Sequence, residues 1–329
     1  MDSGKYILVT GGAGYIGSHM TLALLAAGER PLVVDNLTTG FSDAVPADVP
    51  FFKGDSGDGA FIGSILESHP VEAIIHFAAS IVVPESVSDP LAYYNNNTVN
   101  TRSLIDCAVR HRVPHFVFSS TAAVYGEPQS LPVAEDQPKS PINPYGRSKL
   151  MVEWMLEDVA KAYPLSYAAL RYFNVAGADP QGRAGQSTPN ATHLIKIAVQ
   201  AALGKRNGID VLGTDYPTAD GSCIRDYVHV SDLAQAHLDA LAYLRRGGES
   251  MACNIGYSAG YSVIEVIEVV KRVSGVDFDV RMKDRRAGDP ANLVASNVRA
   301  KTALGWNARY DDLETIVRHA LEWERKLSR

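Results

Sequence analysis

The sequence predicts an α/β protein built on a Rossmann-type, doubly wound parallel sheet, with a smaller mixed α/β lobe toward its C-terminal end. Three observations support this fold class. Near-continuous apolar runs alternate with helical patterns over the first half of the chain, as in parallel sheets covered on both faces. A glycine-rich turn follows the first apolar run. The composition shifts toward Gly, Pro and Gln after Asn174.

The composition describes a globular chain and excludes several classes of protein. Of the 329 residues, 46% are hydrophobic and 21% are charged, which is typical of a folded protein. The net charge is -6 without a run of Lys or Arg, so nucleic acid is not expected as a partner. No stretch reaches the ~18 apolar residues of a membrane span. Three widely spaced cysteines argue against disulfides and a metal site, and predict a reducing, cytoplasmic compartment.

The first predicted strand leads directly into a glycine-rich turn. This strand is Tyr6–Thr10, and the turn carries Gly11, Gly14 and Gly17 before a helical pattern that ends at Gly28. Glycines at such a junction permit a tight turn and let a pyrophosphate approach the N-terminus of the helix. The arrangement is typical of a dinucleotide-binding unit.

Acidic residues end the next two predicted strands. Asp35 closes the strand Pro31–Asp35, ~18 residues beyond the glycine turn, where an acid can bond the adenosine ribose and repel a 2′-phosphate. We therefore expect NAD rather than NADP. Asp55 closes the strand Phe51–Asp55, and it either bonds the adenine amino group or caps the following helix.

The fourth predicted strand, Val71–Phe77, brings small residues to the edge of the sheet where ligands bind. Ala78–Ser80 follow it directly, which indicates a cofactor passing close by. His76 lies inside the apolar run, and we interpret it as a structural histidine with satisfied hydrogen bonds. Asn97 belongs to an Asn triplet that is expected to start the next helix, so it either caps that helix or contacts the cofactor.

The most informative pair is Tyr145 and Lys149, whose spacing places both side chains on one face of a helix. This helix follows a Pro-rich loop after the strand His115–Thr121, which ends in three hydroxyls. A neighbouring ammonium lowers the pKa of a phenol. Moving that pKa from ~10 to ~7 takes roughly 4 kcal/mol, more than one lysine supplies, so a bound cationic ring is expected to contribute. The alternative is a packing tyrosine under a solvated lysine.

Motifs along nearly the whole chain resemble the extended short-chain dehydrogenase/reductase superfamily and, within it, the UDP-galactose 4-epimerase family. The Gly-x-x-Gly-x-x-Gly spacing is the usual one in this superfamily. The matching motifs occur in family order: Thr10–Ser18, Asp35–Leu37, Phe118–Gly126, Pro144–Lys149, Leu170–Asn174, Tyr216–Gly221, Ile224–His229 and Arg285–Asp289.

The resemblance implies roles for individual residues. Tyr145 is the base that takes the proton of the sugar 4-hydroxyl, Thr121 bonds the 4-oxygen, and Lys149 lowers the pKa of Tyr145 and holds the nicotinamide ribose. The implied cofactor contacts are Gly11, Gly14, Tyr15, Ile16, Gly17, Asp35, Asn36, Asp55, Ser56, Phe77, Ala78, Ala79, Asn97, Ser119, Tyr145, Lys149 and Tyr172. The implied substrate contacts are Thr121, Tyr145, Asn174, His193, Leu194, Leu212, Arg225, Arg286, Asp289 and Leu293.

Three positions separate this chain from other members of the resembled family. His193 stands where others have Asn, and Ile81 stands where some have a Lys near the cofactor. Leu293 falls where residue size near the sugar C2 decides whether an N-acetyl group fits, with Tyr excluding it and Cys or Ser admitting it. Leu is intermediate in bulk, which favours unacetylated sugars. The alternative is that Leu293 is a core residue that faces away.

The resemblance implies an isomerase of galactose and carbohydrate metabolism that converts UDP-galactose to UDP-glucose through a transient 4-keto sugar, with NAD as cofactor. Residues 1–174 would bind NAD and residues 175–329 the nucleotide sugar, with edges that interleave. A homodimer through helices near 95–111 and 145–163 is also implied. The alternatives are a 4-epimerase of a UDP-N-acetylhexosamine or UDP-pentose, and a non-catalytic NAD-binding scaffold. A 4,6-dehydratase is disfavoured because Ala122 and Ala123 replace its acid pair.

Overall fold

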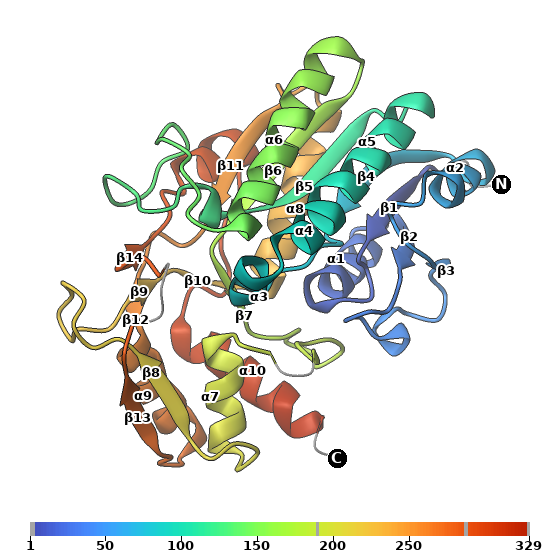
Figure 1. Cartoon of the computed structure of the whole chain (residues 1–329). Coiled ribbons are helices and arrows are strands. Elements are labelled where there is room, and N and C mark those ends of the chain that lie inside the picture. Colours follow the sequence, from blue (N-terminus) through green and yellow to red (C-terminus); the bar gives the residue numbers. More distant parts are fainter. Residues whose placement is uncertain (1–3, 189–190, 286–288, 328–329) are drawn as a thin grey trace.

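The computed structural model describes residues 4–188, 191–285 and 289–327. Its main element is a seven-stranded parallel sheet in the order β11-β6-β5-β4-β1-β2-β3 (Figure 1). The chain builds outward from β1 through β2 to β3, and then crosses to the other side of β1 to start β4. Ligands bind outside the carboxyl ends of strands at such a switch point. The strands are β1 (Tyr6–Thr10), β2 (Arg30–Asp35), β3 (Phe51–Lys53), β4 (Val71–His76), β5 (His115–Thr121), β6 (Ser166–Tyr172) and β11 (Met251–Ile255).

The two faces of the sheet carry separate apolar cores because side chains alternate along each strand. Ile7 and Val9 of β1 point into one core with α1 and α8, whereas Leu8 points into the other core with α2, α5 and α6. Both cores are fully buried, as expected for a doubly wound fold. These helices are α1 (Tyr15–Ala26), α8 (Val230–Arg245), α2 (Gly59–Ser68), α5 (Asn100–Arg110) and α6 (Pro144–Ala162).

A smaller lobe with its own core lies beyond the carboxyl edge of the large sheet (Figure 1). It packs three helices against short strands that form two- and three-stranded sheets. Its helices are α7 (Leu194–Ala202), α9 (Val263–Ser274) and α10 (Leu313–Lys326). Its strands are β7 (Asn174–Ala176), β8 (Ile209–Leu212), β9 (Ile224–Arg225), β10 (Tyr227–His229), β12 (Tyr261–Ser262), β13 (Val280–Lys283) and β14 (Asn292–Leu293).

The predicted fold class is confirmed, and the two parts interleave. β11 pairs with β6 at the edge of the large sheet, and α8 packs on that sheet beside α1. Residues 230–255 therefore return to the first part after the chain has entered the lobe. The division at residue 174 stays a prediction, and α8 and β11 are the later elements that pack with the first part.

The helix before β5 begins earlier than predicted. α4 (Pro90–Tyr93), a π-helical turn (Tyr94–Val99) and α5 follow one another without a break. Pro90 occupies the first helical position, where its missing N–H costs nothing, and the Asp89 carboxylate caps Ala92 N at 3.2 Å. Asn97 therefore lies inside a helix, and the expectation that it caps the helix is wrong. A further short helix, α3 (Val83–Ser88), precedes this region.

No helix in the described part of the chain is long and apolar enough to cross a membrane. The described residues also contain no cluster of three or more His, Cys, Asp or Glu side chains that could hold a metal ion.

Candidate active site

The glycine turn after β1 is packed too closely for any side chain at two of its positions. Gly11 has a φ of 72°, and a Cβ on it would lie 2.6 Å from the backbone N of Ala78. A Cβ on Gly17 would lie 2.1 Å from the carbonyl oxygen of Gly11. These contacts hold the turn against both the β4 loop and the first turn of α1. The glycine spacing therefore serves close backbone packing at the switch point.

The N-terminus of α1 is open to an anionic ligand. Gly14 is its N-cap, with no side-chain cap and no acidic residue in the first turn, so the first N–H groups have no side-chain acceptor. A Cβ on Gly14 would meet only the Gly11 carbonyl oxygen, at 3.2 Å. The turn thus leaves room for a phosphate at the positive end of the helix. These residues fit the pyrophosphate of NAD.

Asp35 lies where a dinucleotide ribose would reach, at the carboxyl end of β2. It is buried, and its carboxylate accepts hydrogen bonds from the N–H groups of Ala13 at 3.0 Å and Leu37 at 2.8 Å. These bonds fix the carboxylate beside the glycine turn. Its negative charge there disfavours a 2′-phosphate. The next residue, Asn36, turns its amide oxygen back to Thr38 N at 3.0 Å.

The structure removes the capping alternative for Asp55. Asp58, not Asp55, caps α2, through Ala60 N at 3.0 Å and Phe61 N at 3.1 Å. The Asp55 carboxylate instead accepts a hydrogen bond from Gly57 N at 2.8 Å, next to buried Ser56. Its contact with adenine stays a prediction.

The loop after β4 is held by Asn97. The Asn97 side chain accepts a hydrogen bond from Ser80 N at 2.8 Å and donates to Ser80 O at 2.9 Å and Ser148 Oγ at 3.1 Å. It thereby joins the loop carrying Phe77–Ala79 to the helix of Tyr145. His76 is structural, as predicted, because Thr10 and Thr101 hydroxyls bond both ring nitrogens. Ile81 is half exposed at the end of this loop.

Thr121, Tyr145 and Lys149 come together at the carboxyl end of β5. Thr121 is the last residue of the strand, and its side chain lies beside the Tyr145 phenol in the first turn of α6. Lys149, one turn further along, donates to the Ser119 carbonyl oxygen at 2.9 Å and lies over the Phe118 ring at 4.9 Å. Asn143 caps α6 through Gly146 N at 2.8 Å. Lys149 is only 2% exposed, so the alternative of a solvated lysine is wrong.

Burial dominates the electrostatics of the triad in the protein alone. Burial raises the pKa of Tyr145, and the hydrogen bond from Thr121 opposes that rise only in part. Burial also lowers the pKa of Lys149 to about 7. The expected lowering of the Tyr145 pKa by Lys149 is therefore absent in the protein alone, because loss of hydration outweighs other effects and the lysine is satisfied by a carbonyl. Tyr172 hydrogen-bonds Ser119 beside the triad, and burial raises its pKa too.

The predicted substrate residues lie on several elements of the lobe. Asn174 starts β7, His193 and Leu194 begin α7, and Leu212 ends β8. Asn174, His193 and Leu194 line one cavity, together with Gln186 and Tyr227. Arg286 lies outside the described residues.

Two other predicted substrate residues are joined by strand pairing. Arg225 in β9 is paired in register with Leu293 in β14, and its guanidinium lies 3.6 Å from the Asp289 carboxylate. Leu293 is 9% exposed, in an apolar cluster that includes Ala122 and Phe173. Ala122 follows Thr121, and Phe173 precedes Asn174. Leu293 is thus a buried residue next to the site rather than remote from it.

A buried polar network, which the sequence did not predict, lies behind the triad. The Arg171 guanidinium pairs with Glu153, Nη2 to Oε2 at 2.5 Å, and donates to Tyr125 Oη at 2.8 Å. Glu153 also accepts from Ser120 Oγ at 2.5 Å, next to Thr121 in β5. Glu153 lies one turn beyond Lys149 on α6, so the network joins β5, β6 and α6 at the site. The sequence signal that was overlooked is an arginine inside the apolar strand β6, because a buried arginine needs a buried partner.

Tyr15 connects the cofactor turn to the lobe. It is the first residue of α1, and its hydroxyl donates to the Gly177 carbonyl oxygen at 2.7 Å. Ile16 follows it in the helix and packs against the core of that face. This hydrogen bond therefore links the first turn of α1, on the proposed cofactor side, to Gly177, on the proposed substrate side.

Comparison with known proteins places the chain among nucleotide-sugar epimerases. Residues 7–256 match the model of the NAD dependent epimerase/dehydratase family. A UDP-glucose 4-epimerase of Azospirillum brasilense is 54% identical over 98% of this chain and 92% of that protein. A UDP-glucose 4-epimerase of Bifidobacterium longum, solved with NAD+ and UDP, has a TM-score of 0.93 at 34% identity, covering 98% of each chain. A UDP-Glc/GlcNAc 4-epimerase of Campylobacter jejuni has a TM-score of 0.86 at 48% identity, covering 98% of this chain and 100% of that one.

The family match covers well over half of the chain, and the curated relative is similar over nearly its full length. The glycine turn, Asp35 and the grouping of Thr121, Tyr145 and Lys149 agree with that match. The chain belongs to the NAD dependent epimerase/dehydratase family, in the extended short-chain dehydrogenase/reductase superfamily.

Proposed function

We propose that the protein is an NAD-dependent isomerase that interconverts UDP-galactose and UDP-glucose at C4 of the sugar. The observation that carries this proposal is the grouping of Thr121, at the carboxyl end of β5, with Tyr145 and Lys149 in successive turns of α6. The strand β5, which ends in Thr121, belongs to the same parallel sheet as β1, which leads into the open N-terminus of α1. The similarity to UDP-glucose 4-epimerases over the full chain supports the same activity.

The residues of the triad divide the proton chemistry. When bound, NAD takes a hydride from C4 of the sugar and returns it to the opposite face. Tyr145 removes the proton of the 4-hydroxyl and later returns it, and Thr121 orients the 4-oxygen by its hydrogen bond. Because burial raises the pKa of Tyr145, its phenol needs positive charge nearby to act as a base near neutral pH. Lys149 supplies part of that charge once it is protonated, and the proposal also gives its ammonium the role of holding the nicotinamide ribose.

The lobe is proposed to hold the UDP group more firmly than the sugar. Arg225 and Arg286 are suited to the diphosphate because a guanidinium binds phosphate oxygens in a fork. Asp289 lies beside Arg225 and would orient that guanidinium. A sugar held only by weak contacts can turn about its link to the diphosphate and present its other face.

UDP-hexoses are proposed as preferred substrates over N-acetylated UDP-sugars. Leu293 supports this preference because it is large, apolar and next to Ala122 and Phe173 at the site. The Campylobacter jejuni relative is named for both kinds of sugar, so the alternative of a UDP-N-acetylhexosamine substrate has a specific observation in its favour. A UDP-pentose is the other alternative.

A homodimer and a cytoplasmic location complete the proposal. The dimer is supported by exposed apolar side chains in the two regions that the resemblance assigns to it, Trp154 on α6 and Val99 at the end of the π-helical turn before α5. The cytoplasmic location is supported by the number and spacing of the cysteines.

The proposed function is tested by incubating the purified protein with UDP-galactose, UDP-N-acetylgalactosamine and UDP-arabinose, each followed by chromatographic separation from its epimer. We expect the fastest conversion with UDP-galactose. Denaturing the protein and identifying the released nucleotide tests the cofactor, and we expect NAD. Conversion of none of the three sugars would leave only the non-catalytic scaffold.

A further inference from the structure

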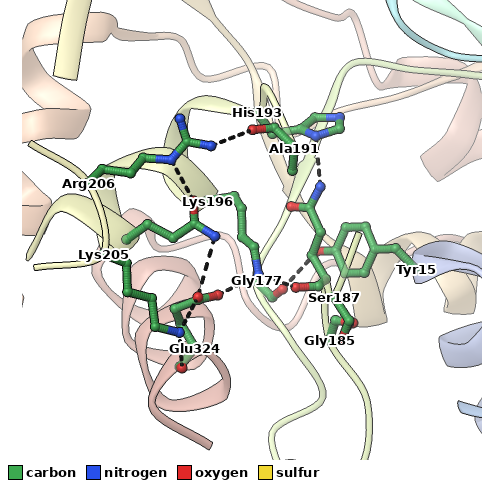
Figure 2. Close-up of polar contacts among 12 residues, drawn as sticks. Tyr15, Gly177, Gly185, Ser187, Ala191, His193, Lys196, Lys205, Arg206 and Glu324 are labelled. Carbon is green, nitrogen blue, oxygen red and sulfur yellow. Dashed lines mark hydrogen bonds and ion pairs between the residues drawn. The ribbon is translucent and has the colours of Figure 1, made fainter. Parts of the chain in front are cut away.

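Residues 177–187, which follow β7, contact both the cofactor helix α1 and the terminal helix α10. Figure 2 shows Tyr15 and Gly177 on one side and Lys196 with Glu324 on the other. At the start of this segment, Tyr15 of the cofactor helix donates to Gly177 O. Further along, Lys326 at the end of α10 donates to Gly182 O at 2.7 Å. Gly185 packs on the Trp323 indole so closely that a Cβ would lie 2.3 Å from its Cγ. The terminal helix therefore helps to determine where residues 182–185 run.

A buried ion network fixes the next residue of the segment, Gln186. The Lys196 ammonium, on α7, donates both to the Gln186 carbonyl oxygen and to the Glu324 carboxylate of α10. Lys196 is 6% exposed and Glu324 is 2% exposed. Lys205 donates to the other carboxylate oxygen at 2.6 Å. Buried charges hold their partners tightly because an unpaired one is costly, so the Gln186 backbone has little freedom.

The Gln186 side chain connects this network to His193. Its Nε2 lies 2.7 Å from Nδ1 of the imidazole. With the amide nitrogen of Gln186 facing the ring, the amide donates, Nδ1 accepts and the ring proton is assigned to Nε2. His193 is the N-cap of α7 and lines the cavity with Asn174 and Leu194. The second ring nitrogen is thus an N–H donor on a solvent-accessible residue of the substrate cavity.

The surroundings of His193 favour the neutral ring. Although the side chain is exposed to solvent in the cavity, the protein around it lowers its pKa by desolvation. The positive end of α7 also disfavours an added charge. The charged groups nearby are Lys196, with Glu324 and Lys205 behind Gln186, and Arg206, which donates to Ala191 O at 3.4 Å.

We propose that Gln186 is a positioning residue that holds His193 as the neutral Nε2–H tautomer, so that the imidazole offers one hydrogen-bond donor to an oxygen of the bound nucleotide sugar. The Lys196–Glu324 pair sets the position of Gln186 and so gives the terminal helix a part in substrate binding. This inference rests on the proposed UDP-sugar function. It explains how a ring can stand where other family members have an amide, since both present an N–H.

The proposal is tested with the variant Gln186→Glu. It keeps the side-chain length and reverses the direction of the hydrogen bond between residue 186 and His193. A carboxylate can only accept, so it draws the proton to Nδ1 and favours the charged ring. The tautomer is read from the nitrogen-15 and carbon-13 shifts of His193 in labelled holoenzyme. We expect Nε2–H in the unchanged protein. In the variant we expect Nδ1–H or a doubly protonated ring.

The kinetic readout separates positioning from general damage. In Gln186→Glu the KM for UDP-galactose should rise about five- to tenfold, the size of one lost hydrogen bond, with kcat within about twofold. It should also acquire a pH dependence near neutrality that the unchanged enzyme lacks. Adding His193→Asn to Gln186→Glu should remove that pH dependence. Gln186→Met, whose side chain cannot donate a hydrogen bond, should raise KM without introducing a pH dependence. Gln181→Glu, an exposed change in the same segment, is the matched control.

Several results would overturn the proposal. The first is an Nδ1–H tautomer in the unchanged protein. The second is a fall in kcat of Gln186→Glu by the same factor as its KM rises. The third is a Gln181→Glu effect as large as that of Gln186→Glu. If Gln186→Glu does not fold, the tautomer of the unchanged protein and the Gln186→Met kinetics decide. Absence of any UDP-sugar turnover would contradict the proposed function instead, while the tautomer would still be measured by the spectrum.

Discussion

Replacing Lys149 with Met should stabilise the cofactor-free protein at acidic and neutral pH. Lys149 is almost fully buried, with one carbonyl and one aromatic ring for its ammonium. Methionine has a similar length and no charge, so it removes the cost of burying that ammonium. The same change should abolish most turnover, which makes Lys149 an example of a functional residue that destabilises the fold.

The size of the effect follows from the lowered pKa of Lys149. Its pKa falls from 10.5 to about 7, which at ~1.36 kcal/mol per unit corresponds to roughly 5 kcal/mol. Below about pH 7 the lysine is charged in both states and the full cost is present. Between about pH 7 and 10.5 the unfolded chain binds more protons than the native state, so stability rises with pH and the cost is progressively lost. The cost should fall by roughly 2–3 kcal/mol between about pH 6 and pH 9.

The assay is urea unfolding of the cofactor-free protein at about pH 6 and pH 9, followed by circular dichroism. The quantity of interest is the free energy of unfolding of Lys149→Met minus that of the unchanged protein, because other titrating groups cancel in that difference. Lys161→Met, on the exposed face of the same helix, is the control and should show almost no difference. A Lys149→Met gap that is the same at both pH values would refute the lowered pKa.

Three further predictions concern the site and its support. Tyr145→Phe removes only the phenol oxygen, so it should fold and retain NAD while turnover falls by ~10²–10⁴; near-normal turnover would exclude Tyr145 as the base. Glu153→Gln leaves the Arg171 guanidinium buried without its ion partner, which should lower the free energy of unfolding by about 3–5 kcal/mol in urea melts; no loss would mean that the pair is not needed. Leu293→Ser should raise the rate on UDP-N-acetylgalactosamine relative to UDP-galactose, and Leu293→Tyr should lower that ratio. The difference in activation free energy between the two sugars should shift by about 1–3 kcal/mol per methylene-sized change; an unchanged ratio would show that Leu293 does not select the sugar.

The sequence allowed the main sheet to be predicted because its strands are apolar runs with clear ends. The strand β11 was not predicted because Met251–Ile255 is short and includes the polar Asn254. That Asn is buried and satisfied by Tyr125 Oη at 2.7 Å and Val133 O at 2.8 Å, contacts from more than one hundred positions away. Such pairing depends on tertiary structure and leaves no local pattern.

The site shows the same division. The glycine turn, Asp35 and the Tyr145–Lys149 spacing could be predicted because each depends on residues close in sequence. Asn97 was misplaced because Pro90 starts the helix seven residues earlier, and an Asn inside a helix resembles a cap when only the triplet is considered. Burial, which the sequence does not give, raises the pKa of Tyr145 in the protein alone, and the lowering expected with a cationic ring bound stays a prediction.

The central claim is that hydrogen leaves C4 of the sugar and returns to the same carbon within one site. It is tested most directly by converting UDP-galactose that carries deuterium at C4, in ordinary water, and locating the deuterium in the product by NMR. We expect UDP-glucose with the deuterium retained at C4, because Tyr145 exchanges only the hydroxyl proton. Product with ordinary hydrogen at C4 would contradict it.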